Sequence, residues 1–200
     1  PERQVLIQAP NYTNQIEVIT NIAKSLPTGY ELYVKEHPGN VFREWRSVSD
    51  YKKIMKLPNV RLIHPSVKSK DVIEKSSLVI VISSTTGLEA AFYNKPSIIF
   101  ADLDYSILPS VHKVESFAEL PSAIKASLKK EVNLSDLNNY INLIEANSVE
   151  LDFDGINSDF MHNFHHGGNL ADVEIPIDKM KLFLERHNAD FDKIAAECIK

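Results

Sequence analysis

Short apolar runs alternate with amphipathic segments along the first two thirds of the chain. Each apolar run has the length of a strand, and several end at a proline or glycine, which stops regular structure. Between them, apolar residues recur at a spacing of three or four, which predicts helices. The predicted strands are residues 3–10, 30–39, 59–65, 78–83 and 96–102, with a short one near residue 111, and the predicted helices are residues 13–27, 41–58, 69–77, 88–93 and a segment ending near residue 130.

This alternation predicts βαβ units, and hence an α/β protein with a three-layer, Rossmann-like parallel sheet. The unbroken β-branched run at residues 78–83 predicts a strand that is buried on both faces. Thr13 or Asn14 is expected to cap the first helix, and Ser69 is expected to cap the third.

The pattern changes near residue 135, where the strands stop. Residues 135–150 are predicted to be helical, residues 152–176 to form a long polar loop, and residues 178–200 to form one helix or two. The expected organisation is a Rossmann-like domain over residues 1–134 and a helical extension over residues 135–200.

The composition argues against several classes of protein. The chain has a formal net charge of −5 and no basic block, so a nucleic-acid partner is not expected. The single cysteine, Cys198, rules out a disulfide within the chain and indicates a reducing compartment. No apolar run approaches the roughly 20 residues of a membrane span, and we expect a cytoplasmic location. Because the chain starts at Pro1 without Met, we expect a piece of a longer protein that carries half of an active site.

Polar side chains follow each of the first five predicted strands. In an open parallel sheet, ligands bind beyond the carboxyl ends of the strands, and these ends share one edge. The side chains are therefore expected to converge. They are Gln8, Pro10 and Asn11 after the first strand, Lys35, Glu36, His37 and Pro38 after the second, His64 and Pro65 after the third, residues 83–87 after the fourth, and Asp102, Asp104 and Tyr105 after the fifth.

Four hydroxyl residues and a glycine stand between the fourth strand and the next helix: Ser83, Ser84, Thr85, Thr86 and Gly87. Free N–H groups at a helix N-terminus and the hydroxyls favour an anion, and glycine lets a ligand approach the backbone. Helix capping needs only one hydroxyl. The turn is predicted to bind a phosphate or a sugar carboxylate, with simple capping as the alternative.

His37, with Lys35 beside it, is predicted to contact the same phosphate. A protonated imidazole there would offset charge or donate a proton to a leaving group, while a hydrogen-bonded structural role is the alternative. His64 occupies the same kind of position with fewer polar neighbours. Glu89, in the first turn of the next helix, either complements the helix dipole or holds hydroxyls of a ribose or sugar.

Other polar groups are weaker candidates. The pairs Asp102/Asp104 and Asp152/Asp154 have the form of catalytic carboxylates, although surface loops carry such pairs routinely. The chain has no P-loop, zinc-finger spacing or G-x-G-x-x-G, so a dinucleotide oxidoreductase is disfavoured, and neither metal nor cofactor is expected. Three histidines could share one helical face, but a solvated loop is preferred to a metal site for them: His162, His165 and His166.

The segments "LYVKEHP", "LPNVRLIHP" and "DVIEKSSLVIVISSTTGLEAAFYNKPSIIF" resemble the C-terminal half of GT-B glycosyltransferases, and more narrowly the capsule polysaccharide biosynthesis proteins. That family is similar in pattern to bacterial Kdo transferases and sialyltransferases, whose HP and Ser-Ser/Ser-Thr motifs contact a cytidine-nucleotide sugar. His37–Pro38 matches the first motif, and Ser83–Ser84, with Thr85, matches the second. The resemblance covers residues 5–128.

The resemblance implies the donor-binding domain of a glycosyltransferase for surface polysaccharide, with a CMP-activated sugar acid such as Kdo or sialic acid as donor. It implies that His37 contacts the donor phosphate or assists the leaving group, and that Glu89 approaches the ribose or the sugar. The hydroxyl residues would bind the phosphate or the sugar-acid carboxylate. The predicted catalytic residue is His37, and the predicted binding residues are Gln8, Lys35, Pro38, His64, Ser83, Ser84, Thr85, Thr86, Gly87 and Glu89.

The resemblance also implies partners. These are the nucleotide sugar, a glycan or glycolipid acceptor, and a separate N-terminal GT-B domain that carries an acidic general base. The full-length protein would attach peripherally to the cytoplasmic face of the inner membrane.

Three alternatives stay open. CDP-glycerol-type glycerophosphotransferases share the HP strand end and a Ser-Ser turn, but they place an Asp just before the serines, where this chain reads "VIVISS". UDP-N-acetylglucosamine epimerase-like proteins share the fold and a Ser-Gly-Glu turn. The third alternative is a non-catalytic domain that recognises a nucleotide or a glycan.

Overall fold

The computed structural model describes residues 3–37, 46–164 and 175–198. The chain divides into two compact units, Pro1–Tyr140 (unit 1) and Ile141–Lys200 (unit 2). This boundary falls inside the helix α8 (Leu134–Ala146). The predicted domain division after residue 134 stays a prediction.

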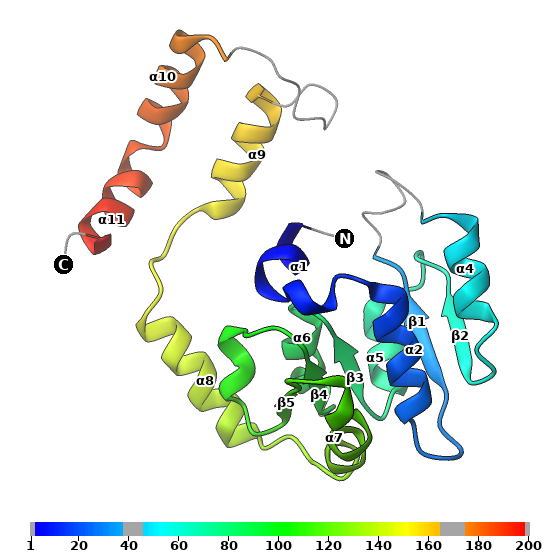
Figure 1. Cartoon of the computed structure of the whole chain (residues 1–200). Coiled ribbons are helices and arrows are strands. Elements are labelled where there is room, and N and C mark those ends of the chain that lie inside the picture. Colours follow the sequence, from blue (N-terminus) through cyan, green and yellow to red (C-terminus); the bar gives the residue numbers. More distant parts are fainter. Residues whose placement is uncertain (1–2, 38–45, 165–174, 199–200) are drawn as a thin grey trace. The chain divides into compact units, whose positions relative to one another are not determined.

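Among the described residues of unit 1 there are five short parallel strands in two sheets (Figure 1). β1 (Leu32–Lys35) pairs with β2 (Val60–Ile63), with Val34 opposite Leu62. β3 (Val79–Val81), β4 (Ser97–Ile99) and β5 (Val111–Lys113) form the second sheet, with Ile80 opposite Ile98. The predicted α/β class with parallel strands is confirmed.

The first predicted strand is wrong, because residues 3–10 begin with the helix α1 (Arg3–Gln8), and the 3-10 turn η1 (Pro10–Tyr12) follows. The Ala9 N–H donates to the carbonyl of Val5 over 2.9 Å. Helical spacing places Val5 and Ala9 on one face, where both are buried in the core. The neighbouring Leu6 and Ile7 are 50% and 81% exposed.

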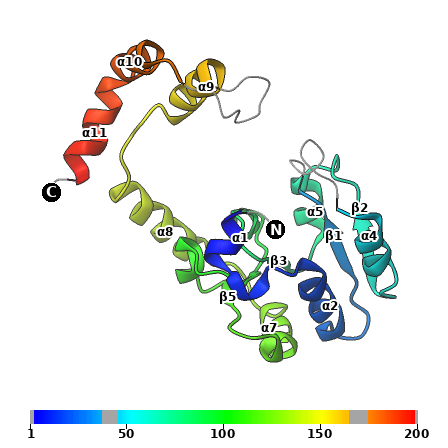
Figure 2. The same ribbon diagram turned by 45° about the horizontal axis from the view of Figure 1, so that its top comes forward.

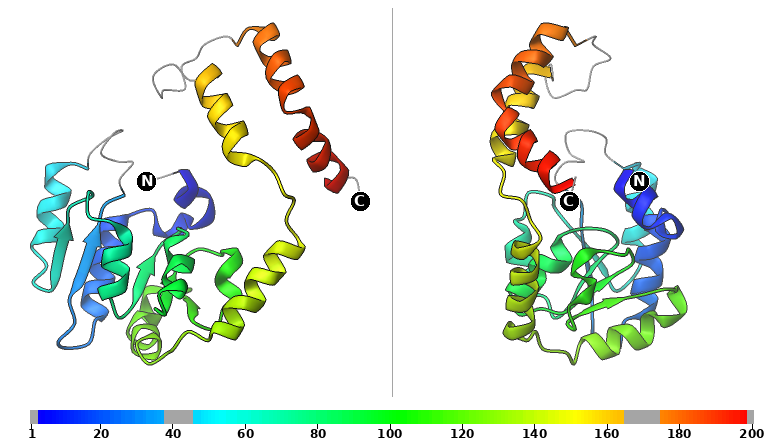
Figure 3. Two further views of the ribbon diagram at one scale, coloured as in Figure 1. Left: turned by 180° about the vertical axis from the view of Figure 1, so that it is seen from behind. Right: turned by 90° about the vertical axis from the view of Figure 1, so that its left-hand side faces the viewer.

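Helices cover both faces of the strands in unit 1. α2 (Gln15–Ser25), α4 (Val48–Met55) and α7 (Leu120–Ser127) lie on one face, and α2 packs against the other two (Figure 2). α5 (Ser69–Lys75) and α6 (Thr86–Phe92) lie on the opposite face (Figure 3, left). Between β4 and α7 stand two further 3-10 turns, η2 (Asp104–Ile107) and η3 (Phe117–Glu119).

The predicted helix caps have mixed outcomes. The Asn14 side chain accepts a hydrogen bond from the Glu17 N–H over 3.2 Å and caps α2, as predicted. Ser69 is not a cap, because it is the first residue of α5, and Lys68 before it makes no side-chain capping bond. Lys68 has extended backbone angles, so the helix starts at Ser69, one residue earlier than a cap at Ser69 implies.

Each sheet has its own core cluster. Ile98 of β4, Phe100 and the α7 residue Ile124 are buried together with residues of α1 and α2. Ala23, Ile54 and Val60 form the smaller cluster beside β1 and β2. The expectation that residues 78–83 are buried on both faces is wrong, because all three residues of β3 are only partly buried. β4 is the strand with every residue buried.

Unit 2 contains α9 (Phe153–Phe164), α10 (Ile177–Arg186) and α11 (Asn188–Cys198). The predicted polar loop over residues 152–176 is wrong over α9. Its apolar residues Phe160 and Phe164 are four positions apart, so they lie on one face of the helix, and both contact Phe183 of α10. The many polar residues of this segment made that apolar face hard to recognise from the sequence. The predicted helical region at residues 178–200 consists of two helices, with Cys198 exposed.

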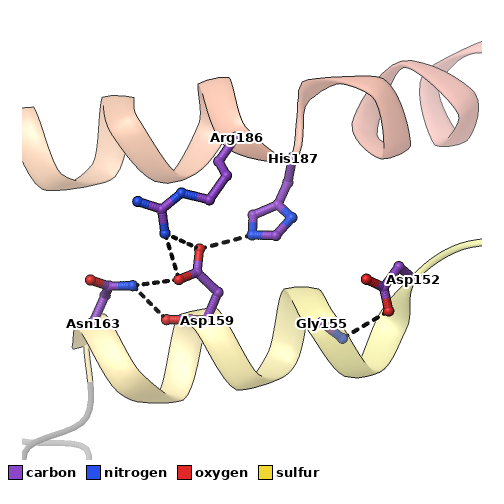
Figure 4. Close-up of polar contacts among 6 residues, drawn as sticks. All are labelled: Asp152, Gly155, Asp159, Asn163, Arg186 and His187. Carbon is purple, nitrogen blue, oxygen red and sulfur yellow. Dashed lines mark hydrogen bonds and ion pairs between the residues drawn. The ribbon is translucent and has the colours of Figure 1, made fainter.

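Asp159 joins α9 to the end of α10 (Figure 4). Arg186 Nη1 donates to both carboxylate oxygens over 2.7 and 2.8 Å, and His187 Nε2 lies 2.9 Å from Oδ2. The Asn163 amide donates to Oδ1 over 2.8 Å. The hydrogen bond from His187, with a further contribution from Arg186, lowers the pKa of Asp159.

No helix in the described ranges combines the length and the apolar composition needed to cross a membrane.

Acidification is expected to loosen the packing of α9 on α10. Because the pKa of Asp159 is lowered, its contribution to stability is complete above the ordinary carboxyl pKa of about 3.9. That contribution is lost as the pH falls through the lower, folded pKa. The ring-proton NMR shifts of Phe160, Phe164 and Phe183 should collapse toward unfolded values in this range.

Asp159→Asn should show the same loosening already at pH 7, because the amide lacks the charge that Arg186 and His187 face. Asp154→Asn is the matched control, since Asp154 is exposed on the same helix. Equal ring shifts in the two variants at pH 7 would contradict the role given to Asp159.

Candidate functional site

The hydroxyl turn, residues 83–87, connects β3 to α6. Ser83 is buried, and its hydroxyl donates a hydrogen bond to the side-chain carbonyl of Gln8. These residues are 75 positions apart in the sequence. Gln8 was predicted to follow a strand and instead ends α1, yet the structure does bring it to the hydroxyl turn.

The four hydroxyls of this turn have different roles. Ser84 Oγ accepts the Thr86 N–H over 3.2 Å and donates to Thr86 Oγ1 over 3.1 Å. The side chains of Ser84 and Thr86 therefore stabilise the turn itself. Thr85 is exposed and its hydroxyl makes no capping bond to α6, so it is available to a ligand.

Tyr105 of η2 lies beneath the turn and is 1% exposed. Its hydroxyl donates to the carbonyl of Ser84. Burial, followed by the charge of Asp104, raises the pKa of Tyr105, so the phenol stays protonated and able to donate. Gly87 is buried against the same ring, and a Cβ added there would lie 2.5 Å from Tyr105 Oη. A glycine is therefore required at position 87 because the Tyr105 ring, and not a ligand, lies close to the backbone there.

A charged group forms at the carboxyl end of β1. Arg46 Nε lies 2.6 Å from Glu36 Oε2, with the two side chains 26% and 12% exposed, and its Nη2 donates to the Gln15 side chain. The Tyr51 hydroxyl lies 3.4 Å from the same carboxylate. Burial and the charge of Glu36 raise the pKa of Tyr51. Arg46, Gln15 and Tyr51 were not predictable as members of this group, because their contacts join segments that are separate in the sequence.

The predicted basic residues lie at the carboxyl ends of β1 and β2. His37 is exposed and Lys35 is half-buried, while Pro38 lies outside the described residues. His64 is exposed, and its Nδ1 accepts the Ser66 N–H over 3.2 Å. The same Nδ1 lies 2.7 Å from Ser66 Oγ, so this ring nitrogen is occupied within the loop.

A cleft of about 520 Å³ lies between the two sheets of unit 1. Its walls are largely apolar and include Val34 of β1 and Ile80 of β3, with Ile22 of α2 beside them. Its polar lining includes Lys35, Glu36, Arg46 and His64. Two groups of predicted site residues can thus be placed. Gln8 and Ser83 meet at the hydroxyl turn, and Lys35 and His64 line this cleft. β1 and β3 both end on the same side of unit 1 (Figure 1).

The remaining acidic candidates have ordinary surface or structural surroundings. Glu89 is exposed in the first turn of α6. Asp102 lies 3.4 Å from Lys113 Nζ. Asp104 accepts the Tyr140 hydroxyl over 2.9 Å, and burial together with this bond raises the pKa of Tyr140 to about 12. Asp104 therefore attaches α8 to η2.

The described part of the chain contains no group of three or more His, Cys, Asp or Glu side chains that could hold a metal ion. His162 is exposed on α9, and His165 and His166 lie outside the described residues.

Gly87→Ala is expected to destabilise unit 1 by about 1–3 kcal/mol, because the new methyl group meets the buried Tyr105 ring. Tyr105→Phe alone should cost about 0.5–1.5 kcal/mol through the lost hydrogen bond. The double variant should lose less stability than the sum of the two single losses, because the phenol oxygen that the new methyl group meets is then absent. Urea unfolding of the three variants measures this, and strict additivity would show that Gly87 and Tyr105 do not constrain each other.

Comparison with known proteins gives one family. A sequence model described as capsule polysaccharide biosynthesis protein matches residues 2–110, which is more than half of the chain. No curated protein and no solved structure matches this chain. The matched range includes the hydroxyl turn, the carboxyl ends of β1 and β2, and Tyr105. This chain therefore belongs to the capsule polysaccharide biosynthesis protein family.

Proposed function

We propose that unit 1 is the donor-binding part of a GT-B glycosyltransferase that acts in capsule synthesis. The proposed donor is a CMP-activated sugar acid such as Kdo or sialic acid, and the acceptor is a glycan or glycolipid. The proposal rests mainly on the hydrogen bond between Ser83 and Gln8. It brings together polar residues that are far apart in the sequence. Both residues lie inside the range that matches the family.

The hydroxyl turn is suited to an oxyanion because its shape is fixed before a ligand arrives. Tyr105 holds the Ser84 carbonyl, and Gln8 holds the Ser83 hydroxyl. The exposed Thr85 hydroxyl then offers a donor at low cost in side-chain entropy. α6 has only seven residues, so its dipole adds little, and the hydroxyls themselves provide the recognition.

Positive charge at the end of β1 complements a phosphate. Lys35 ends this strand and His37 comes two residues later. β1 and β3 end on the same side of unit 1 (Figure 1). In the proposed complex, the Thr85 hydroxyl and the His37 imidazole contact the donor phosphate, and Glu89 accepts hydrogen bonds from the sugar or ribose. A protonated His37 stabilises the charge that develops on the leaving phosphate.

In the proposed transfer, an acceptor hydroxyl oxygen forms a bond to the anomeric carbon while the bond from that carbon to the phosphate oxygen breaks. CMP leaves with the electron pair, and the acceptor proton passes to a general base. We assign that base to a partner domain, because Glu36, the acidic residue at the end of β1, is bound by Arg46. The proposed setting is the cytoplasmic face of the inner membrane.

A calorimetric titration of the chain with CMP, CDP, UDP and ADP separates the alternatives. The proposal predicts saturable binding with CMP preferred. A preference for CDP would favour the glycerophosphotransferase class, and a preference for UDP would favour the epimerase-like class. Binding of a glycan without any nucleotide would favour a non-catalytic recognition module, and the absence of nucleotide binding at millimolar concentration would contradict the proposal.

Variants locate the binding site. Thr85→Ala and His37→Ala are each expected to weaken CMP binding about 10- to 100-fold, the usual cost of losing a hydrogen bond to a charged group. Ser84→Ala should weaken it as well, partly by loosening the turn. Thr85→Ser should retain affinity, because it keeps the hydroxyl.

Ser122→Ala is the matched control for the hydroxyl variants, since Ser122 is exposed and donates only to the Glu119 carbonyl. Unchanged CMP affinity in both Thr85→Ala and His37→Ala, with folding intact by circular dichroism, would place any nucleotide elsewhere on the chain.

A further inference from the structure

Unit 2 has a small hydrophobic core. Among its described residues, the buried apolar side chains are Phe164 of α9 and Phe183 of α10, and α11 contains no buried residue. α11 has 11 residues, and a helix of this length is marginal in water without packing against other structure. Unit 2 therefore leaves apolar surface that a further structural element would cover.

The first uncovered surface is the beginning of α9. Phe153 is the first residue of α9 and lies seven positions before Phe160, so helical spacing places both on one face. The Phe160 ring contacts Phe183 of α10, with the ring centroids 5.9 Å apart. Phe153, by contrast, is 69% exposed. The apolar face of α9 thus extends past its contact with α10 toward the N-terminal end of the helix.

The second uncovered surface is one side of α11. The Phe191 ring contacts Phe183, with the ring centroids 6.1 Å apart, so this side of α11 points toward the aromatic contacts between α9 and α10. Ile194 and Cys198 follow Phe191 at spacings of three and four, which places them on the same side. Ile194 is 38% exposed, and Cys198 is exposed.

The two uncovered surfaces lie at the same end of unit 2. α11 follows His187 toward the end of α9 that carries Asp152 (Figure 4). Lys193 of α11 donates to the carbonyl of Glu150, just before α9, over 3.3 Å. α10 packs against both helices, whereas α9 and α11 approach each other more weakly. Their apolar residues form what we call the α9–α11 face: Phe153, Ile156, Phe191, Ile194 and Cys198.

The surroundings of the α9–α11 face are acidic. Residues 141–200 contain 12 Asp and Glu but only 5 Lys and Arg, a formal net charge of −7. Asp152 and Asp154 are exposed on either side of Phe153 in the sequence, and Asp192 is exposed two positions before Ile194. Like charge opposes the pairing of this face with a second copy of itself. The same charge opposes an anionic membrane surface or a nucleic acid.

We propose that the α9–α11 face binds a cationic amphipathic helix of a partner protein. The apolar side of that helix covers Phe153 and Ile194, and its Lys or Arg side chains face the surrounding carboxylates. The described part of unit 2 contains no strand to which an extended peptide could add. A helix laid along α9 and α11 instead completes a small bundle, in which each apolar stripe is covered by side chains of a neighbour.

This inference is separate from the proposed nucleotide site. The match to the capsule family ends at residue 110, so unit 2 lies outside the matched range. The hydroxyl turn and the end of β1 belong to unit 1. Either proposal can therefore fail while the other holds.

A fluorescence anisotropy titration of the full chain with a labelled peptide tests the proposal. The probe is a synthetic peptide of Leu and Lys, about five helical turns long, with Leu at positions i, i+3, i+4 and i+7. We expect saturable binding, at least about 10-fold tighter than that of a peptide with the same composition in scrambled order. Equal affinity for the two peptides would show charge attraction alone and would overturn the proposal.

Variants of apolar residues locate the binding surface without changing the net charge. Phe153→Asn and Ile194→Asn are each expected to weaken peptide binding by about 10-fold or more, because each removes an apolar anchor. Ile107→Asn is the matched control, since Ile107 is a 60% exposed isoleucine of unit 1. Unchanged affinity in both unit 2 variants would overturn the proposal.

A charge variant keeps the test independent of the apolar substitutions and of their effect on folding. Asp154→Asn combined with Asp192→Asn should slow association and weaken the salt dependence of peptide binding, since both carboxylates are exposed. An unchanged association rate and salt dependence would contradict the cationic character of the partner.

Sedimentation velocity of the chain alone tests whether a second copy covers the face. The proposal predicts a monomer, because unit 2 repels its own kind. A dimer that Phe153→Asn dissociates would overturn the proposal, since the occupant of the α9–α11 face would then be a second copy of this chain.

Discussion

The buried hydroxyl of Tyr105 holds the Ser84 carbonyl, and the candidate site is arranged around the turn that this hydrogen bond fixes. The ring occupies the space beside Gly87, so a side chain at that position would displace it. Gln8 restrains the same turn from the opposite end of the sequence. These contacts leave Thr85 as the exposed hydroxyl of a turn whose other groups are already bound.

The βαβ pattern was predictable from residue 13 to about residue 130, because buried strands and amphipathic helices have different apolar spacings. The helix at the start of residues 3–10 was not predictable, since apolar residues at positions 5 and 9 are compatible with a strand or with one face of a helix. α9 was missed because only Phe160 and Phe164 mark its apolar face. In each of these segments, packing decided the structure where local sequence left two options.

The candidate site was partly predictable for a similar reason. Position after a strand identified Lys35, His37 and the hydroxyl turn, because parallel strands end on a common edge. It placed Tyr105 after the fifth strand without its role beneath the turn, and it did not point to Arg46, because both roles depend on contacts across separate segments. The prediction for Gly87 named a close approach, and the structure shows a tyrosine ring in that place.

We propose that the turn between β3 and α6, together with the end of β1, binds the nucleotide. The most direct test is an NMR titration of the isotopically labelled chain with CMP, followed through the backbone amides. We expect saturable shift changes that are largest at residues 83–89 and 35–37. Saturable changes confined to other residues, or none at millimolar CMP, would contradict it.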